Sequence, residues 1–356
     1  MITRIKNRPW TVLAAVATIG LLAGCSAPAD TGSNSDEQGT WTAAEVLDGS
    51  GGRVAAPLFA VPKNVESYEF AFLNPGLSVP TFKDWQTGVQ DAADFYGVKI
   101  TQTDLDLKYE NALTSYGTVA VKSPVIVGSG AGAANAALLS GVEADGAKLV
   151  LIDQDLEGAP SFGVDNATTG EIGGQFLVEA AQGRIDSDWA GKNVVYVGIS
   201  AASCEPCDVR VQKGGDVVAD ALSLTSEPGF LLPDPGTADQ AQIVFTDYLT
   251  AHPDDVFVVL GFGDGAAVGA LNALKAADRL DDAVVGSLGG DISGRTALRD
   301  PSNAKAFVGA LDFNPYQEGW NWVEAAIATQ LGKSFATYDA STVLTPANVD
   351  DFYPND

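Results

Sequence analysis

The sequence predicts an α/β fold of two doubly wound lobes, each built on a parallel sheet. From residue 67 onward, short apolar runs alternate with longer amphipathic stretches, as in strand–helix–strand units on parallel sheets. This alternation contains more strands than one mononucleotide-type sheet uses. The chain has 356 residues, of which 46% are hydrophobic, so it can build the cores of two domains.

The first series of predicted elements follows residue 67. Its best-marked helix is Thr81–Tyr96, in which apolar residues recur at helical spacing. The stretch Leu107–Val121 is more weakly marked but is also expected to be helical. The other predicted helices are Ala131–Ala144 and Gly170–Gln182, and the predicted strands are Tyr68–Asn74, Val98–Thr103, Pro124–Gly128 and Lys148–Asp153.

A second series of the same kind begins at Asn193. Apolar runs again precede amphipathic stretches, as expected for right-handed βαβ units. The predicted strands are Asn193–Ser200, a run near Phe230, Val256–Phe262, Ala283–Leu288 and Ala306–Asp312. The predicted helices are Asp208–Leu222, Thr237–Ala251, Gly265–Ala277, Gly294–Asp300 and Tyr316–Leu331.

The first 25 residues have the features of an export signal. Three basic residues precede an apolar stretch, Thr11–Gly24, that is shorter than the roughly 20 residues of a membrane-spanning helix. The stretch ends in Leu-Leu-Ala-Gly before Cys25, which resembles the lipobox of bacterial lipoproteins. That resemblance implies cleavage after residue 24, a lipid on Cys25 and an extracytoplasmic, membrane-anchored protein. The alternative is an ordinary signal peptide with a chance Cys.

Two segments of different character separate this signal from the first strand. Residues 26–40 are rich in Ser, Asp and Gly and have little to bury, so they are expected to form a flexible stalk. Residues 41–65 have no clear pattern, and packing on the body as an N-terminal extension is one interpretation of them.

The composition excludes several classes of partner. The chain has 46 acidic and 20 basic residues and a net charge of −26, which excludes a nucleic-acid groove or a surface for anionic lipids. Charged residues make up only 19% of the chain, so global disorder is also excluded. The single His excludes histidine-rich metal sites, and no cofactor is expected.

Aromatic and polar residues gather where the predicted strands end. In open parallel sheets, ligands bind beyond the carboxyl ends of the strands. Aromatic rings, carboxylates, amides and one arginine at these positions suit a small polyhydroxy molecule. Any one of these residues could instead serve packing alone, so their shared location carries the argument. The candidates are Phe82, Trp85, Asp153, Gln154, Arg210, Asp264 and Phe313.

The order of these pieces resembles the periplasmic-binding-protein type I family, the sugar-binding components of ABC importers. The resemblance covers nearly the whole chain from about residue 66. Its matching stretches are Tyr68–Phe82, residues 149–174, residues 194–200 followed by Arg210, residues 257–277 and residues 307–326. In that family, two lobes joined by three chain crossings close on a ligand by a hinge motion.

The resemblance implies how the chain is divided between these lobes. Crossings are expected near Asp165–Asn166, Asp312–Asn314 and Ser341–Leu344. The implied segments are a signal peptide at 1–24, an anchor, stalk and extension at 25–65, an N-terminal lobe at 66–164 plus 314–342, and a C-terminal lobe at 165–313 plus 343–356.

The resemblance also assigns roles to four residues. Phe82 matches a ring that stacks on sugar, and Asp153 matches a carboxylate that binds hydroxyl groups. Arg210 matches an arginine of the second lobe, and Asp264 matches the Asp of an Asn-Asp pair.

Other positions depart from the family pattern. Gln154 stands where an Arg is usual, and Phe313 stands where a Gln is usual. Leu288 occupies the place of an Asp, and Asp291 could supply the missing carboxylate. These changes remove hydrogen-bond donors, so the expected solute is larger or less hydroxylated than a simple pentose.

The resemblance implies a solute-binding lipoprotein, expected as a monomer, that captures a sugar-like molecule and hands it to an ABC permease without a catalytic step. One alternative is a two-lobe sensor that reports ligand to a membrane signalling partner. The other is an exported nucleotide-dependent enzyme. For this last class, Gly128-x-Gly130-x-x-Ala133 and the later Asp153 come close to a dinucleotide-binding fingerprint. The unit is not the first of its lobe, and an exported chain would need its cofactor outside the cell.

Two further motifs have competing interpretations. Cys204-Glu-Pro-Cys207 lies between a strand and a helix, as redox motifs do, but outside the cytosol a structural disulfide is favoured. The run that begins at Asp153 resembles the start of a calcium loop. Its twelfth position is Val164 instead of Glu, so the bidentate ligand is missing.

Overall fold

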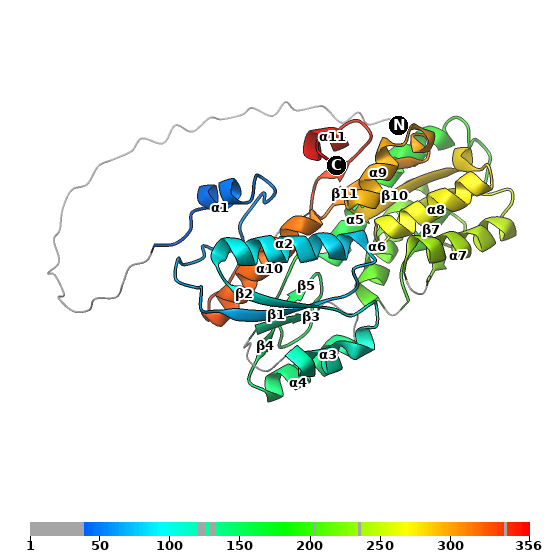
Figure 1. The fold of residues 1–356 in the computed structure, drawn as a ribbon. Coiled ribbons are helices and arrows are strands. Elements are labelled where there is room, and N and C mark those ends of the chain that lie inside the picture. Colours follow the sequence, from blue (N-terminus) through cyan, green and yellow to red (C-terminus); the bar gives the residue numbers. More distant parts are fainter. Residues whose placement is uncertain (1–38, 120–124, 129–132, 203, 234–235, 338–339) are drawn as a thin grey trace, which may run out of the picture. The chain divides into compact units, whose positions relative to one another are not determined.

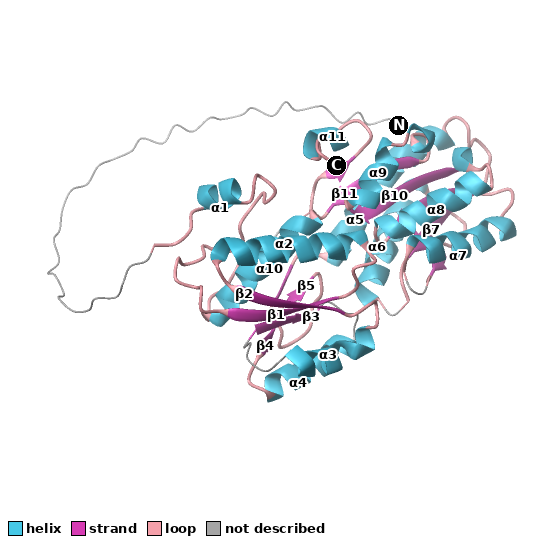
Figure 2. Cartoon of the chain, viewed as in Figure 1, coloured by secondary structure: helices cyan, strands magenta, loops and turns pink. Residues whose placement is uncertain are grey.

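The computed structural model describes residues 39–356, except 120–124, 129–132, 203, 234–235 and 338–339. The predicted signal, Cys25 and most of the predicted stalk lie outside the described residues. The described chain forms two larger sheets, each with helices on both faces (Figures 1 and 2). The predicted α/β fold with parallel sheets is therefore confirmed. Within the described ranges, no helix combines the length and the apolar character needed to cross a membrane.

The first sheet has four parallel strands in the order β2-β1-β3-β4. Phe70 and Phe72 of β1 pack with α2 and α10, while Ala71 and Leu73 pack on the opposite face with α3 and α4 (Figure 1), as the two-residue period of a strand requires. We call this sheet and these helices the first lobe. Its elements are β1 (Glu69–Asn74), α2 (Pro80–Tyr96), β2 (Lys99–Asp104), η1 (Tyr109–Asn111), α3 (Ala112–Val119), β3 (Val125–Gly128), α4 (Ala133–Ala144), β4 (Lys148–Leu149) and α10 (Pro315–Gln330).

The second sheet has six strands in the order β12-β11-β10-β9-β7-β8, and only β12 runs antiparallel to its neighbour. Val195, Val197 and Ile199 of β7 face α7 and α8, while Tyr196 faces α5 and α6. We call this sheet and its helices the second lobe. Its elements are α5 (Asn166–Ile185), β7 (Val194–Ile199), α6 (Glu205–Leu222), β8 (Gly229–Leu231), α7 (Ala238–Ala251), β9 (Val256–Gly261), α8 (Asp264–Ala276), η2 (Leu280–Asp282), β10 (Ala283–Gly289), α9 (Ile292–Arg299), η3 (Pro301–Asn303), β11 (Phe307–Asp312), β12 (Val343–Leu344) and α11 (Val349–Phe352).

Several predicted elements differ from the structure in their bounds, and two of these differences have a clear physical cause. The strand expected over Lys148–Asp153 is divided, because after β4 the chain leaves the sheet and β5 (Leu151–Ile152) pairs with β6 (Ser161–Phe162). The helix expected over Leu107–Val121 begins only at Ala112, since Leu107 has a φ of 59° and donates its N–H to Pro75 O at 2.8 Å. A residue with that backbone conformation cannot occupy a right-handed helix.

The chain passes between the two lobes at three places. It runs from β6 into α5 through Asp165, whose side chain caps that helix by accepting a hydrogen bond from Thr168 N. It returns from β11 to α10 through Phe313 and Asn314, and it enters the second sheet again at β12 after α10 has ended.

Helices α2 and α10 approach closely because each contains a glycine that faces the backbone of the other helix. A Cβ atom on Gly88 would lie 2.0 Å from Tyr316 O, and one on Gly319 would lie 2.2 Å from Trp85 O. Any side chain larger than hydrogen at either position would push the helices apart. These glycines therefore bring the α2 residue Trp85 within reach of the first turn of α10.

Residues 40–65 pack on the first lobe and contain the short helix α1 (Ala43–Gly49), which begins with a capping box between Thr42 and Glu45. The buried Glu324 carboxylate of α10 accepts hydrogen bonds from Leu58 N at 2.7 Å and from Tyr96 Oη at 2.8 Å. The ambiguous segment of the sequence is thus part of the first-lobe core. Its buried residues are Val46, Val54, Leu58, Val61 and Val65.

Candidate functional site

Asp153 follows β5 at the edge of the first lobe. Its φ of 56° turns the chain out of the strand, and a Cβ atom at the facing Gly163 would meet its Oδ1 at 2.1 Å. Oδ1 accepts a hydrogen bond from Val164 N at 2.8 Å, and the Asp153 carbonyl accepts one from Asn166 Nδ2 at 3.0 Å. Asp153 is 9% exposed, and these hydrogen bonds hold its carboxylate in one orientation.

Arg210 of α6 reaches Asp153 from the second lobe. Its Nη2 lies 3.5 Å from Asp153 Oδ2, and its Nε donates to Asn166 Oδ1 at 2.7 Å. The guanidinium also lies over the Phe313 ring, 4.8 Å from its centroid. A Cβ atom at Gly170 of α5 would come within 2.2 Å of Arg210 O, so this glycine allows α6 to lie close enough for these contacts. Three predicted site residues from both lobes therefore meet.

A pair of aromatic residues from α2 adjoins this group. The Trp85 and Phe82 ring centroids are 5.1 Å apart, and Trp85 is buried with 4% exposure. Trp85 Nε1 donates a hydrogen bond to Oε2 of the fully buried Glu318 at 2.6 Å. Glu318, which the sequence did not single out, thus joins the aromatic pair to the first turn of α10.

Asp264 and Asp291 form a second group of site residues. Asp264, at the start of α8, accepts hydrogen bonds from Ser287 Oγ at 2.5 Å and from Asp291 N at 2.6 Å. Asp291 caps α9 through Ser293 N, and its Oδ2 accepts a hydrogen bond from Thr81 Oγ1 of α2 at 2.8 Å. Thr81 therefore links the first lobe to this group.

The electrostatics of both groups are dominated by burial. Burial raises the pKa of the Asp153 carboxyl, although Arg210 and the Val164 N–H oppose the rise. Burial raises the pKa of Asp264 to about 8, and the neighbouring Asp291 adds to that rise. The same cause raises the pKa of Asp312 to about 6. The site is therefore rich in buried carboxyl groups whose charged forms hydrogen-bond donors would stabilise.

The last predicted site residue, Gln154, forms its hydrogen bond with a residue outside both of these groups. Its Oε1 accepts a hydrogen bond from Asn135 Nδ2 of α4, and no contact with the Asp264–Asp291 group is recorded among the described residues. Asn135 and Asn166 are site neighbours that the sequence did not mark, because neither stands at the end of a strand.

Cys204 and Cys207 are joined by a disulfide at the start of α6. This is the pairing that the sequence analysis favoured over a free redox pair. Since Arg210 lies one turn further along the same helix, the disulfide closes the loop that leads to it.

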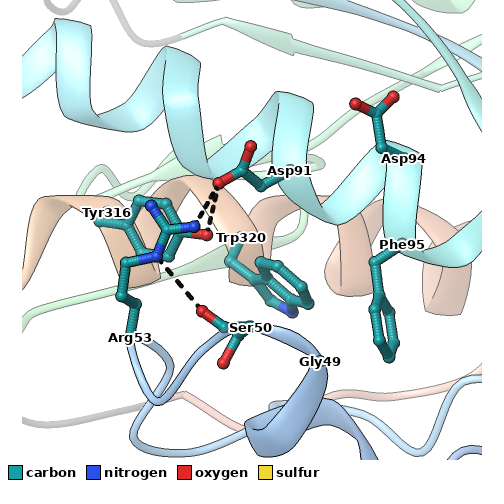
Figure 3. A pocket seen from close by; sticks show the side chains of 8 residues that line it. All are labelled: Gly49, Ser50, Arg53, Asp91, Asp94, Phe95, Tyr316 and Trp320. Carbon is teal, nitrogen blue, oxygen red and sulfur yellow. Dashed lines mark hydrogen bonds and ion pairs between the residues drawn. The ribbon is translucent and has the colours of Figure 1, made fainter.

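Two cavities lie away from these residues. One, of about 250 Å³, lies between residues 49–53 and helices α2 and α10 (Figure 3). There the Arg53 guanidinium stacks over Tyr316 at 4.4 Å and pairs with Asp91 at 2.9 Å, so these side chains fasten the extension to the first lobe. The other, of about 560 Å³, lies beside α4 and the end of α10. No cluster of three or more His, Cys, Asp or Glu suited to a metal is found within the described chain.

Comparison with known proteins places this arrangement in a family. The periplasmic binding protein domain matches residues 70–334. No curated protein matches the chain significantly. Among solved structures, an ABC transporter solute-binding protein from Agrobacterium vitis with bound allitol aligns with a TM-score of 0.68 at 17% identity, covering 81% of this chain and 98% of that one.

Two further structures align in the same way. A solute-binding protein from Mycobacterium smegmatis with bound glycerol has a TM-score of 0.66 at 20% identity, covering 80% of this chain and 96% of that one. A periplasmic solute-binding protein from Actinobacillus succinogenes with bound D-allose has a TM-score of 0.66 at 17% identity, covering 80% and 100%. At these identities the alignments establish the fold.

Proposed function

Since the chain belongs to the periplasmic binding protein family, with residues 70–334 matching its domain, we propose that it captures a sugar-like small molecule between its two lobes and delivers it to the permease of an ABC transporter. It is a binding protein without a catalytic step. The first lobe, which is N-terminal, comprises residues 66–164 and 314–342, with the extension up to residue 65 packed on it. The second lobe, which is C-terminal, comprises residues 165–313 and 343–356.

The observation that supports this function best is the meeting of Asp153 and Arg210. They come from different lobes, both are nearly buried, and they are 3.5 Å apart. A carboxylate and a guanidinium together offer acceptors and donors in fixed directions, which suits the paired hydroxyl groups of a sugar or polyol. The Phe82, Trp85 and Phe313 rings supply flat apolar surfaces for its C–H faces.

Binding by this site couples the solute to lobe closure. Hydroxyl groups that bind between Asp153 and Arg210 would replace part of their direct interaction and would join the two lobes through the solute. A solute that makes contacts in both lobes binds the closed arrangement more tightly than the open one and shifts the population toward it. The permease can then distinguish loaded from empty protein by its shape.

The Asp264–Asp291 group supplies further acceptors on the second-lobe side. Allitol, glycerol and D-allose, bound by the structurally similar proteins, are all neutral polyhydroxy compounds, which supports the same class of solute here. Cleavage after residue 24 and a lipid on Cys25 would hold the protein at the outer side of the membrane, close to its permease.

A thermal-shift screen tests the proposal. Sugars, polyols, nucleosides and NAD are added separately to the protein, and at least one sugar or polyol is expected to raise the melting temperature, because binding stabilises the folded state. Asp153→Asn and Asp264→Ala should each reduce that shift while melting cooperatively without solute. Stabilisation by NAD and by no sugar or polyol would refute the proposal.

A further inference from the structure

The N-terminal extension is attached to α10 by a row of hydrogen bonds. Three side chains of the helix bond to the backbone of residues 55–58, and their positions are four and three residues apart, so they share one face. The contacts are Gln317 Oε1 with Ala55 N at 2.8 Å, Asn321 Nδ2 with Ala56 O at 3.2 Å, and Glu324 Oε2 with Leu58 N at 2.7 Å. The extension is therefore held by specific polar contacts as well as by apolar packing.

One of these three side chains also contacts the chain between the lobes. We call residues 312–314, where the chain returns from β11 to α10, the second crossing. Gln317 Oε1 accepts a hydrogen bond from Asn314 Nδ2 at 3.3 Å, and Gln317 N donates one to Asn314 Oδ1 at 3.3 Å. Gln317 is buried, with 3% exposure. The same Gln317 oxygen thus binds both the extension and the second crossing.

Asn314 has a backbone conformation that depends on its surroundings. Its φ of 49° and ψ of 68° lie in the left-handed region, which is unfavourable for residues other than glycine and persists where contacts hold it. On the second-lobe side, Asn314 N donates to Asp312 Oδ1 at 2.8 Å, and Asp312 Oδ2 accepts from Tyr353 Oη at 2.8 Å. On the first-lobe side, the contacts with Gln317 hold the same residue.

The second crossing also contains a residue of the candidate site. Phe313 N donates to Gly289 O at 2.8 Å, and the Arg210 guanidinium lies 4.8 Å from the centroid of the Phe313 ring. In hinge motions a few residues at the ends of elements absorb the change in φ and ψ. The angles held at Asn314 therefore belong to the lobe arrangement in which Arg210 lies 3.5 Å from Asp153.

We propose that Gln317 is a positioning residue of the hinge, through which the N-terminal extension holds the second crossing in this conformation. This inference rests on the proposed function, because it concerns the closure of the lobes on a solute. Ala55 N orients the Gln317 side chain, which in turn holds Asn314 in its left-handed conformation. A larger fraction of the protein then has the binding arrangement, and the measured affinity rises with that fraction.

Three variants separate this role from simple packing of the extension on α10. Gln317→Leu removes the acceptor that the extension and the second crossing share. Ala55→Pro removes only the N–H donor of the extension and leaves α10 unchanged. Asn321→Leu is the matched control, because Asn321 also bonds to the extension, through Ala56 O. Among the described residues, no contact between Asn321 and the second crossing is recorded.

The first measurement needs no solute. Hydrogen–deuterium exchange is followed by mass spectrometry in peptides from the extension, from residues 312–318 and from β9, which serves as an internal reference. Exchange in the extension should rise in all three variants. In residues 312–318 it should rise by about threefold or more in Gln317→Leu and Ala55→Pro, because losing a hydrogen bond makes local opening easier. It should stay at the wild-type rate there in Asn321→Leu.

Two results of this measurement would overturn the proposal. One is wild-type exchange in residues 312–318 of Ala55→Pro, and the other is an equal rise there in Asn321→Leu. A variant is folded if its exchange in β9 matches the wild type. If Gln317→Leu fails that criterion, Ala55→Pro decides, because Ala55 is exposed and lies outside the helix.

The second measurement uses the sugar or polyol with the largest effect in the thermal-shift screen as its probe. In calorimetry, Gln317→Leu and Ala55→Pro should bind it about threefold to tenfold more weakly than the wild type, because a smaller fraction of the protein has the binding arrangement. Asn321→Leu should bind within about twofold of the wild type. An equal loss of affinity in all three variants would contradict a specific role of Gln317.

The proposed function and the positioning role fail separately. If no sugar or polyol binds, the proposed function is wrong, while hydrogen exchange still decides whether the extension holds the second crossing. If a solute binds tightly and both Gln317→Leu and Ala55→Pro bind it as well as the wild type does, the function stands and the positioning role is wrong.

Discussion

Gly88 offers a sharp test of the packing that builds the first-lobe side of the site. A Cβ atom there would lie 2.0 Å from Tyr316 O and 2.8 Å from Trp320 N, both backbone atoms of α10. Backbone atoms cannot rotate away as a side chain does. The Gly88→Ala protein must therefore move α2 and α10 apart by about 1 Å to restore normal contact distances.

The expected loss of stability follows from two opposing effects. Overpacking costs about 1–3 kcal/mol, with the upper end expected here, and replacing a helical Gly with Ala returns about 1 kcal/mol. The net loss should be about 2 kcal/mol. Gly183 of α5 is the matched control, because it also stands within a helix and a Cβ atom there would meet nothing within 4 Å. Gly183→Ala should gain about 0.5–1 kcal/mol.

Urea unfolding followed by tryptophan fluorescence measures both free energies. Separating the helices should also weaken the hydrogen bond between Trp85 and Glu318, so the native fluorescence should change in Gly88→Ala and not in Gly183→Ala. If Gly88→Ala were as stable as the wild type, α2 and α10 would not pack through this glycine. The position of Trp85 would then need another explanation.

Three further predictions concern other parts of the molecule. Burial raises the pKa of Glu324 from 4.5 to about 7, so the folded state holds this proton more tightly than the unfolded state does. The proton therefore adds up to about 3 kcal/mol to the free energy of unfolding. This contribution is complete below about pH 4.5 and is lost as the pH rises through 7. Urea unfolding at several pH values should show that the free energy of unfolding falls less with rising pH in Glu324→Gln than in the wild type. An equal fall in both proteins would contradict this prediction. Arg210→Lys should bind the solute at least about tenfold more weakly by calorimetry, since an ammonium cannot keep the planar contacts with Asn166 and Phe313, whereas the exposed Lys213→Ala on the same helix should bind normally. Removing the Cys204–Cys207 disulfide with paired Ser substitutions should cost no more than about 2 kcal/mol in urea unfolding, because its loop is short; a larger loss would mean that the bond orders α6 itself.

The fold was predictable because it depends on periodicity. Thr81–Tyr96 and Val256–Phe262 were each predicted to within one residue at either end, since their apolar patterns match their burial. The errors arose where one residue's backbone or a tertiary contact decides the outcome. Leu107 lies in a stretch predicted to be helical but has a φ of 59°, and β12 is two residues long and has no pattern of its own.

The candidate site was predictable only in part, for a related reason. Asp153, Asp264 and Asp291 follow strands, and the topology of a parallel sheet brings such positions to one edge. Which of these residues contact one another depends on side-chain packing, and the spacing of residues along the sequence does not determine that packing. Gln154 bonds to Asn135, and Asp291 is held by Thr81 from the other lobe. Nothing in the sequence distinguishes these partners from other amides and hydroxyl groups.

The acidic residues show which buried groups can be recognised from the sequence and which cannot. Among the described residues, the buried acids are Asp153, Asp264, Asp291, Glu318 and Glu324, a small part of the 46 acids in the chain. An Asp after a strand is recognisable as a site candidate, whereas a Glu inside a helix is assigned by default to its solvated face. Helix α10 has almost no solvated face, since 14 of its 16 residues are buried. Its two glutamates must therefore be satisfied internally, one by the extension and one by the candidate site, and their burial follows from the packing of α10 against α2 through Gly88 and Gly319.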